Sequence, residues 1–210
     1  MSETPVIATE PLLTIQQVRV LACLMEKHLA TPKNYPLSAN SLQIACNQKS
    51  NRGLVMDLSI GQVEHTASEL ESLDYVRMEL GDRAKRFSHR GPAKFKIDRH
   101  GQAILAMLML REPLTLVEIM ARTERLANCD DLEHVKLVTD DLVEREVPLA
   151  ILIPKGPGQR EDRYTHLLNG TPNLELIAKH KSHTAKEEIA ILKARVAELE
   201  LELQTLKDND

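Results

Sequence analysis

The sequence predicts a mainly α-helical protein with small β-hairpins (α+β), built as two tandem winged helix-turn-helix domains followed by a C-terminal helical tail. One order of local signals, three amphipathic helices and then a hairpin, occurs twice along the chain. Two pairs of matching positions share one offset, since Pro36 and Pro113, like Arg86 and Arg163, lie 113 − 36 = 163 − 86 = 77 residues apart. A heptad pattern follows the second copy.

Five of the six predicted helices begin at a residue that can cap a helix N-terminus. A hydroxyl or carboxylate oxygen at this position accepts a backbone N–H that the helix itself leaves unpaired. In the first copy we predict helices over residues 14–29, 38–46 and 59–73, capped by Thr14, Ser38 and Ser59, with capping boxes Thr14/Gln17 and Ser59/Gln62. In the second copy we predict helices over 102–110, 115–124 and 130–145, with capping boxes Thr115/Glu118 and Asp130/Glu133.

After each third helix the hydrophobic period shortens to about two residues, which is typical of a β-strand. The alternating runs are residues 75–80 and 149–153, and each meets a glycine-containing turn. The return strands are Arg86–His89 and Arg163–His166. Each copy therefore ends in a hairpin, the wing of a winged helix.

These elements divide the chain into four parts: a flexible N-terminus (1–11), a first winged-helix domain (12–96), a second winged-helix domain (97–170) and a C-terminal helix or short coiled coil (171–210). The heptad seam of the tail is Ile189, Leu192, Val196, Leu199, Leu203 and Leu206. This seam is short for an isolated coiled coil. Pairing with a second copy to form a homodimer and folding back on its own domain both remain open.

The composition indicates an ordinary globular protein, with 42% hydrophobic residues and a formal net charge of −4. A negative chain lacks the global positive field of a protein that coats nucleic acid, so nucleic-acid contact requires a local patch. Neither a signal peptide nor an apolar run long enough to span a bilayer is present. We therefore expect a cytoplasmic protein without a membrane partner.

Positive charge is concentrated between Arg77 and Arg99, where eight basic and three acidic residues give 8 − 3 = +5. The candidate nucleic-acid-binding residues of this first wing are Arg83, Lys85, Arg86 and Arg90. Such a patch suits phosphate contact, although cations on an edge strand also prevent aggregation. Both predicted third helices, by contrast, are acidic, which makes them poor surfaces to place against phosphates.

The polar loop between the second and third helices of the first copy supplies further candidates. Asn, Gln and Arg side chains can pair with base edges, and they equally suit turns and caps. The candidate nucleic-acid-binding residues of this loop are Asn47, Gln48, Lys49, Asn51 and Arg52. The second copy is shorter here and lacks the cluster, so the first copy is the better candidate for binding.

At this loop the chain resembles the bacterial YceH family. The resemblance covers roughly residues 12–170 and rests on Asn34-Tyr35-Pro36-Leu37-Ser38, Cys46-Asn47-Gln48-Lys49-Ser50-Asn51-Arg52 and Tyr164-Thr165-His166-Leu167-Leu168. It implies a tandem winged-helix fold without an established biochemical role. One departure is Gly53 before Leu54-Val55-Met56, where the family pattern has a proline before Val-Met.

No signature of catalysis, cofactor binding or metal binding is found, so we expect neither an enzyme nor a cofactor. Cys23, Cys46 and Cys129 are scattered without CxxC spacing, and we expect no metal site. His180 and His183 lack neighbouring ligand residues. Aromatic residues make up 2% of the chain, which argues against stacking platforms for single strands.

Two functions therefore remain. In the first, the protein binds duplex DNA in the manner of a transcription regulator, through the 47–53 loop and the basic wing. In the second, it is a protein–protein interaction module whose acidic third helices dock on another protein, with no nucleic-acid binding. The fold is shared by both classes and the acidic helices favour the second. Because DNA binding is frequent among winged-helix proteins, we slightly favour the first function.

Overall fold

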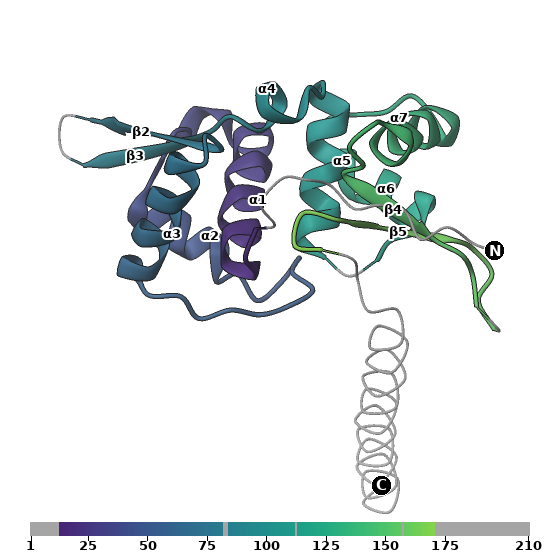
Figure 1. Ribbon diagram of the computed structural model, residues 1–210, viewed down its shortest axis with the longest axis horizontal. Helices are drawn as coiled ribbons and strands as arrows, with labels where there is room; N and C mark the ends of the chain where they lie inside the picture. Colours follow the sequence, from purple (N-terminus) through teal and green to yellow (C-terminus); the bar gives the residue numbers. More distant parts are fainter. Residues whose placement is uncertain (1–12, 82–83, 112, 157, 171–210) are drawn as a thin grey trace, which may run out of the picture. The chain divides into compact units, whose positions relative to one another are not determined.

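The structure, a computed structural model, describes residues 13–81, 84–111, 113–156 and 158–170. Within these residues the chain forms a mixed α/β fold of seven α-helices and two small antiparallel sheets (Figure 1). The chain up to Gly170 belongs to one compact unit. The heptad positions of the tail, His180, His183 and Arg83 lie outside the described residues. The homodimer therefore stays a prediction.

The first half follows the predicted order of helices and hairpin. Its elements are α1 (Ile15–Ala30), the 3-10 helix η1 (Pro32–Asn34), β1 (Leu37–Ser38), α2 (Ala39–Cys46), α3 (Ile60–Ser72), β2 (Val76–Leu80), β3 (Lys85–His89) and α4 (Gly91–Phe95). The N-caps Thr14, Ser38 and Ser59 are confirmed, and Thr14 and Ser59 form the predicted capping boxes with Gln17 and Gln62. The elements η1, β1 and α4 were not predicted, because each is too short to show a hydrophobic period.

The second half contains α5 (Arg99–Leu110), α6 (Leu116–Thr123), α7 (Leu132–Glu144), β4 (Ala150–Ile153) and β5 (Arg163–His166). The Thr115/Glu118 capping box is confirmed. Two predicted helix starts are wrong. Helix α5 begins at Arg99, three residues before the predicted start at residue 102, because Asp98 caps it by accepting from the Gly101 N–H. Helix α7 is capped by Asp131, which accepts from the His134 N–H at 2.8 Å, so the predicted Asp130/Glu133 box does not form.

The two halves repeat one anchoring geometry. Leu37 pairs with Phe87, and Leu114 forms an isolated β-bridge with Tyr164. Each residue of the second pair lies 77 positions after its counterpart in the first, since 114 − 37 = 164 − 87 = 77. Arg86 Nη1 donates to the Pro36 carbonyl at 2.9 Å. Its counterpart Arg163 donates to the Pro113 carbonyl at 2.8 Å. In both halves, the return strand is thus tied to the segment that precedes the second helix.

The core is centred on α1 and α5, which pack side by side (Figure 1). Every residue of α5 from Gly101 to Leu110 is buried, because α1 covers one side and α6, α7 and β5 cover the other. Gln102 Nε2 donates to the Met25 carbonyl at 2.9 Å and so joins the two helices. None of the helices in the described ranges has the length and apolar character that a membrane crossing requires.

Candidate functional site

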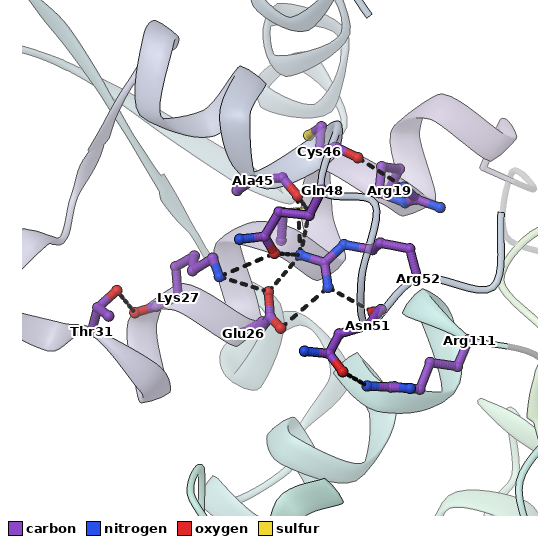
Figure 2. Close-up of polar contacts among 11 residues, drawn as sticks. Arg19, Glu26, Lys27, Thr31, Ala45, Cys46, Gln48, Asn51, Arg52 and Arg111 are labelled. Atoms are coloured by element: carbon purple, nitrogen blue, oxygen red, sulfur yellow. Dashed lines mark hydrogen bonds and ion pairs between the residues drawn. The ribbon is translucent and has the colours of Figure 1, made fainter. Parts of the chain in front are cut away.

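Several polar side chains of the 47–53 loop have hydrogen-bond partners within the protein. Arg52 is buried, and its guanidinium forms two contacts with Glu26, at 2.7 Å to Oε2 and 3.3 Å to Oε1 (Figure 2). The same group donates to the Ala45 carbonyl at 3.0 Å and to Gln48 Oε1 at 2.8 Å. We therefore withdraw Arg52 as a base-reading residue, because its guanidinium is buried and both of its Nη groups are bonded inside the protein.

The carboxamides of this loop also have internal partners. Asn47 bonds Leu58 in both directions, accepting from its N–H at 2.9 Å and donating to its carbonyl at 2.8 Å. Asn51 Oδ1 accepts from Arg111 Nη2 at 2.5 Å. Among the loop candidates, Lys49 and Asn51 are exposed. The polar character of the loop is explained mainly by its own folding.

Two more arginines brace this loop from outside it. Arg19 is buried and donates to the carbonyls of Cys46, at 2.8 Å, and Leu54, at 2.5 Å. Arg111 holds Asn51, as Figure 2 shows. The Gly53 N–H donates to the Leu110 carbonyl at 2.8 Å, at the end of α5. The loop is therefore fastened to both halves.

The candidate cations in and just after the β2–β3 hairpin are placed differently. Lys85 and Arg86 lie on β3 and are exposed. Arg90 Nη1 lies 2.6 Å from Asp74 Oδ1, and both side chains are more than half exposed. An exposed ion pair of this kind is weak and still allows contact with another anion. Of these wing residues, Arg86 faces a cavity.

This cavity is a cleft of about 630 Å³ bounded by the end of α1, η1, β1, α2 and β3. We call it the cationic cleft and define it by its polar lining residues: Lys27, Thr31, Lys33, Asn34, Tyr35, Ser38, Ser41, Gln48 and Arg86. Among the described residues that line it, three carry positive charge and none carries a carboxylate. The cleft brings together Gln48 and Arg86, one candidate from the loop and one from the wing.

Two acidic side chains close to the cleft, Glu26 and Glu79, each lie beside an arginine that does not line it. Glu26 lies 3.3 Å from Lys27 Nζ but also forms the buried pair with Arg52. Glu79 stands opposite Arg86 in the β2–β3 register, and it lies 3.6 Å from Arg77 Nε. Both carboxylates stay outside the cleft lining. The cleft is therefore a local positive site on a negatively charged protein.

The repeat explains why such a cleft belongs to the first half. Arg163, the counterpart of Arg86, lies 2.8 Å from Glu118 Oε2. The residue equivalent to Glu118 in the first half is Ser41, since 118 − 77 = 41. A carboxylate thus neutralises the arginine of the second half, whereas the equivalent position of the first half carries a hydroxyl, which lines the same cleft as Arg86.

Tyr35, which lines the cleft, and the neighbouring rings of His28 and His89 are uncharged at neutral pH. Burial, and then His28, lowers the pKa of His89 to about 3. Burial, and then Arg99, lowers the pKa of His28. Tyr35 accepts the His89 N–H at 2.6 Å, and burial raises the pKa of its hydroxyl. At neutral pH the charge of the cleft therefore comes from its lysines and arginine.

Two carboxylates of α3 have structural partners. Glu71 Oε1 accepts the Met78 N–H at 2.8 Å, and Glu69 Oε2 accepts from Gln17 Nε2 at 3.2 Å. These bonds tie α3 to β2 and α1. Part of the acidity of the third helix is thus explained by packing within the first half.

Several residues that the fold brings together were not predicted from the sequence as ligand-binding residues. Lys27, Lys33, Ser38 and Ser41 were not singled out as ligands, because they are separated from Arg86 by about fifty residues or more of sequence. The available signal was the repeat, in which Ser41 replaces Glu118. A second missed group, His100, Cys129 and His134, has ligand atoms that all lie within 4.8 Å of one another and could hold a metal ion.

Comparisons with known proteins place the chain among bacterial relatives. A family described as "Protein of unknown function, DUF480" matches residues 13–159. A UPF0502 protein of Xanthomonas campestris is 39% identical over 203 residues, covering 94% of this chain and 90% of its own length. A UPF0502 protein of Cellvibrio japonicus is 37% identical over 207 residues, covering 94% of this chain and 95% of its own length.

Proposed function

The chain belongs to the DUF480 family, whose description assigns no activity, and we propose from its own geometry that it binds the phosphate backbone of duplex DNA through the cationic cleft. The observation that carries this proposal is the 630 Å³ cleft, where Lys27, Lys33 and Arg86 meet without a carboxylate in the described lining. Phosphate contacts supply most of the affinity of non-specific DNA binding.

The proposal treats each half as a winged helix. Each half has three longer helices and then an antiparallel hairpin, and the two share the anchoring geometry at an offset of 77 residues. The resemblance to the YceH family belongs to the same proposal. In helix-turn-helix proteins the helix before the recognition helix crosses the DNA backbone, and here that helix is α2.

The N-terminus of α2 adds to the attraction for phosphate. Helix N-termini carry partial positive charge and N–H groups without helical partners. The hydroxyls of Ser38 and Ser41 lie in this first turn and line the cleft with Arg86. A phosphate oxygen at this place meets the Ser41 hydroxyl, two lysines and a guanidinium.

The predicted mode of binding has weak sequence preference. Base reading requires polar side chains that reach the groove, whereas the loop carboxamides are engaged internally and α3 exposes Glu64. We therefore expect positioning contacts to dominate. Affinity should then depend steeply on salt and only slightly on sequence.

The first experiment is a fluorescence-anisotropy titration of a mixed-sequence duplex at salt concentrations from about 50 to 200 mM. The variant Lys33→Glu/Arg86→Glu should remove two phosphate contacts, which makes the salt slope less negative by about 2. Over this fourfold change in salt, the affinity of the unmodified protein should fall about 12-fold further than that of the variant.

The matched control is Arg125→Glu/Lys155→Glu, which makes the same change of net charge at exposed residues away from the cleft. Circular dichroism checks that both variants fold. Equal losses in the two variants would show that only net charge matters, and the cleft would not be the site. Absence of binding by the unmodified protein at low salt would also overturn the proposal.

A sharper variant is Ser41→Glu, which copies the arrangement of the second half. The glutamate should reach Arg86 as Glu118 reaches Arg163, and it completes a capping box with Ser38. We expect unchanged or slightly raised thermal stability together with a severalfold loss of duplex affinity. Ser41→Gln keeps the cap without the charge and should bind nearly normally. Equal binding by both variants would contradict the role of Arg86.

A second candidate function is docking on another protein through the acidic face of α7. On this helix Leu137 is 70% exposed and lies beside Lys136, close in sequence to Asp140 and Asp141. A large exposed apolar side chain within a polar face is a feature of interaction sites. A partner captured by the unmodified protein and by Lys33→Glu/Arg86→Glu, but lost on Leu137→Asp, would favour this function.

A further inference from the structure

A group of metal-ligating side chains lies in the second half, apart from the cationic cleft. His100 belongs to the first turn of α5, Cys129 precedes α7, and His134 belongs to the first turn of α7. Their ligand atoms all lie within 4.8 Å of one another. The two imidazole ring centres are 4.8 Å apart, with their planes inclined by 57°.

From this arrangement we infer that His100, Cys129 and His134 form a binding site for a transition-metal ion of the zinc class. A tetrahedral zinc ion with two nitrogen ligands and one sulfur ligand requires ligand atoms about 3.3–3.6 Å apart. The two imidazoles are partly exposed, with 28% of each side chain accessible, so small rotations can close the remaining distance. The fourth position is left to water or to an aspartate.

Carboxylates surround the group and suit a cation. Asp98 Oδ2 lies 3.4 Å from His100 Nδ1, and Asp130 Oδ2 lies 3.7 Å from His134 Nδ1. Carboxylates beside ligating histidines orient the rings and raise their basicity. Asp131, the N-cap of α7, adds a third negative charge. These charges offset the unfavourable effect of two helix N-termini on a cation.

The Cys129 thiol is free and buried, with 5% of the residue exposed. Burial raises its pKa, and Asp130, Asp98 and Asp131 raise it further. Without a cation, the thiol therefore keeps its proton. A bound divalent ion takes the sulfur as thiolate, and the thiol proton is released to solvent. The soft sulfur ligand favours zinc-class ions over magnesium or calcium.

The sequence carries no motif for this site. Cys129 lies 129 − 100 = 29 residues after His100 and 134 − 129 = 5 residues before His134, and none of these intervals is a CxxC or HxxxH pair. The expectation that the chain has no metal site rested on such spacings. The packing of α5 against α7 brings the three residues together.

The test uses the full-length, tag-free protein after treatment with a chelator. Titration with Co²⁺ should give the visible absorption of tetrahedral cobalt and a near-ultraviolet thiolate-to-cobalt band, both saturating at one ion per chain. Zn²⁺ should then displace the cobalt and abolish both bands. Cys129→Ser should lose the thiolate band, and His134→Asn should weaken Co²⁺ binding at least tenfold.

Two controls address the other candidate ligands. Cys46→Ala removes a buried sulfur of the first half, and His65→Gln removes an exposed histidine of α3. Both variants should keep one cobalt ion and the thiolate band. The inference is overturned if the unmodified protein shows no thiolate band, or if Cys129→Ser keeps the same spectrum. Duplex binding is measured separately, so failure here leaves the cationic cleft untouched.

Discussion

Replacing Arg52 by methionine is expected to lower the free energy of unfolding by about 3 kcal/mol or more. The change removes a guanidinium that is buried beside Glu26 and bonded to Ala45 and Gln48. Glu26 would remain largely buried, with 11% of its side chain exposed, and Lys27 at 3.3 Å would be its remaining charge partner. Urea denaturation followed by circular dichroism measures the loss.

The double variant Arg52→Met/Glu26→Leu tests the cause of this loss. Replacing both members of a buried ion pair with apolar residues commonly restores stability, because no unpaired charge is left. We expect the double variant to recover much of the loss. Lys49→Met, an exposed cation of the same loop, should change stability by less than about 0.5 kcal/mol. A loss below about 1 kcal/mol in Arg52→Met would contradict the structural role assigned to this arginine.

The second large effect is destabilisation by mild acid. Burial lowers the pKa of His89 to about 3 and that of His166 to about 4, so both rings are neutral in the folded protein above these values. In the unfolded chain they bind protons below pH 6.5, their ordinary pKa. Stability is therefore complete above pH 6.5 and falls as the pH drops toward 4. At pH 5 the two histidines together lower the free energy of unfolding by about 4 kcal/mol at most, relative to its value at neutral pH.

Hydrogen bonds support the neutral form of both rings. His166 Nδ1 accepts the Leu168 N–H at 3.3 Å, and His89 Nε2 lies 3.0 Å from His28 Nδ1. His89→Gln should make stability less dependent on pH between 6.5 and 5. His65→Gln, on the exposed face of α3, should leave this dependence unchanged. A free energy of unfolding that is constant from pH 7 to 5 would contradict the neutral burial of these histidines.

The sequence predicted most helices because their starts are encoded locally. Thr14, Ser59 and Thr115 each bond a residue three positions away, so the signal lies within one turn. Helix α7 shows the limit of such signals, since Asp130 and Asp131 are adjacent and both can cap. The choice between them depends on the packing of the whole helix. Very short elements, such as β1, exist only through pairing with distant residues.

The candidate site was harder to predict, because residue type does not reveal burial. In the sequence, Arg52 and Lys49 look equally suited to bind a ligand. They differ because Arg52 pairs with Glu26, and this partner lies 26 residues away, so the sequence does not reveal the pair. The cleft likewise depends on η1 and β1, which place Lys33 near Arg86. The repeat did carry usable information. Glu118 pairs with Arg163 in the second half, and the equivalent residue of the first half is Ser41, so the sequence indicates that Arg86 lacks this carboxylate partner.

Duplex binding at the cationic cleft is tested most directly by an amide NMR titration of the isotopically labelled protein with a short mixed-sequence duplex at low salt. If the duplex binds there, the largest shift changes occur at residues 33–41 and at Arg86, and at the same duplex concentration they are clearly smaller in Ser41→Glu. Shift changes concentrated on the exposed faces of α3 and α7, with residues 33–41 unaffected, would contradict binding at the cleft.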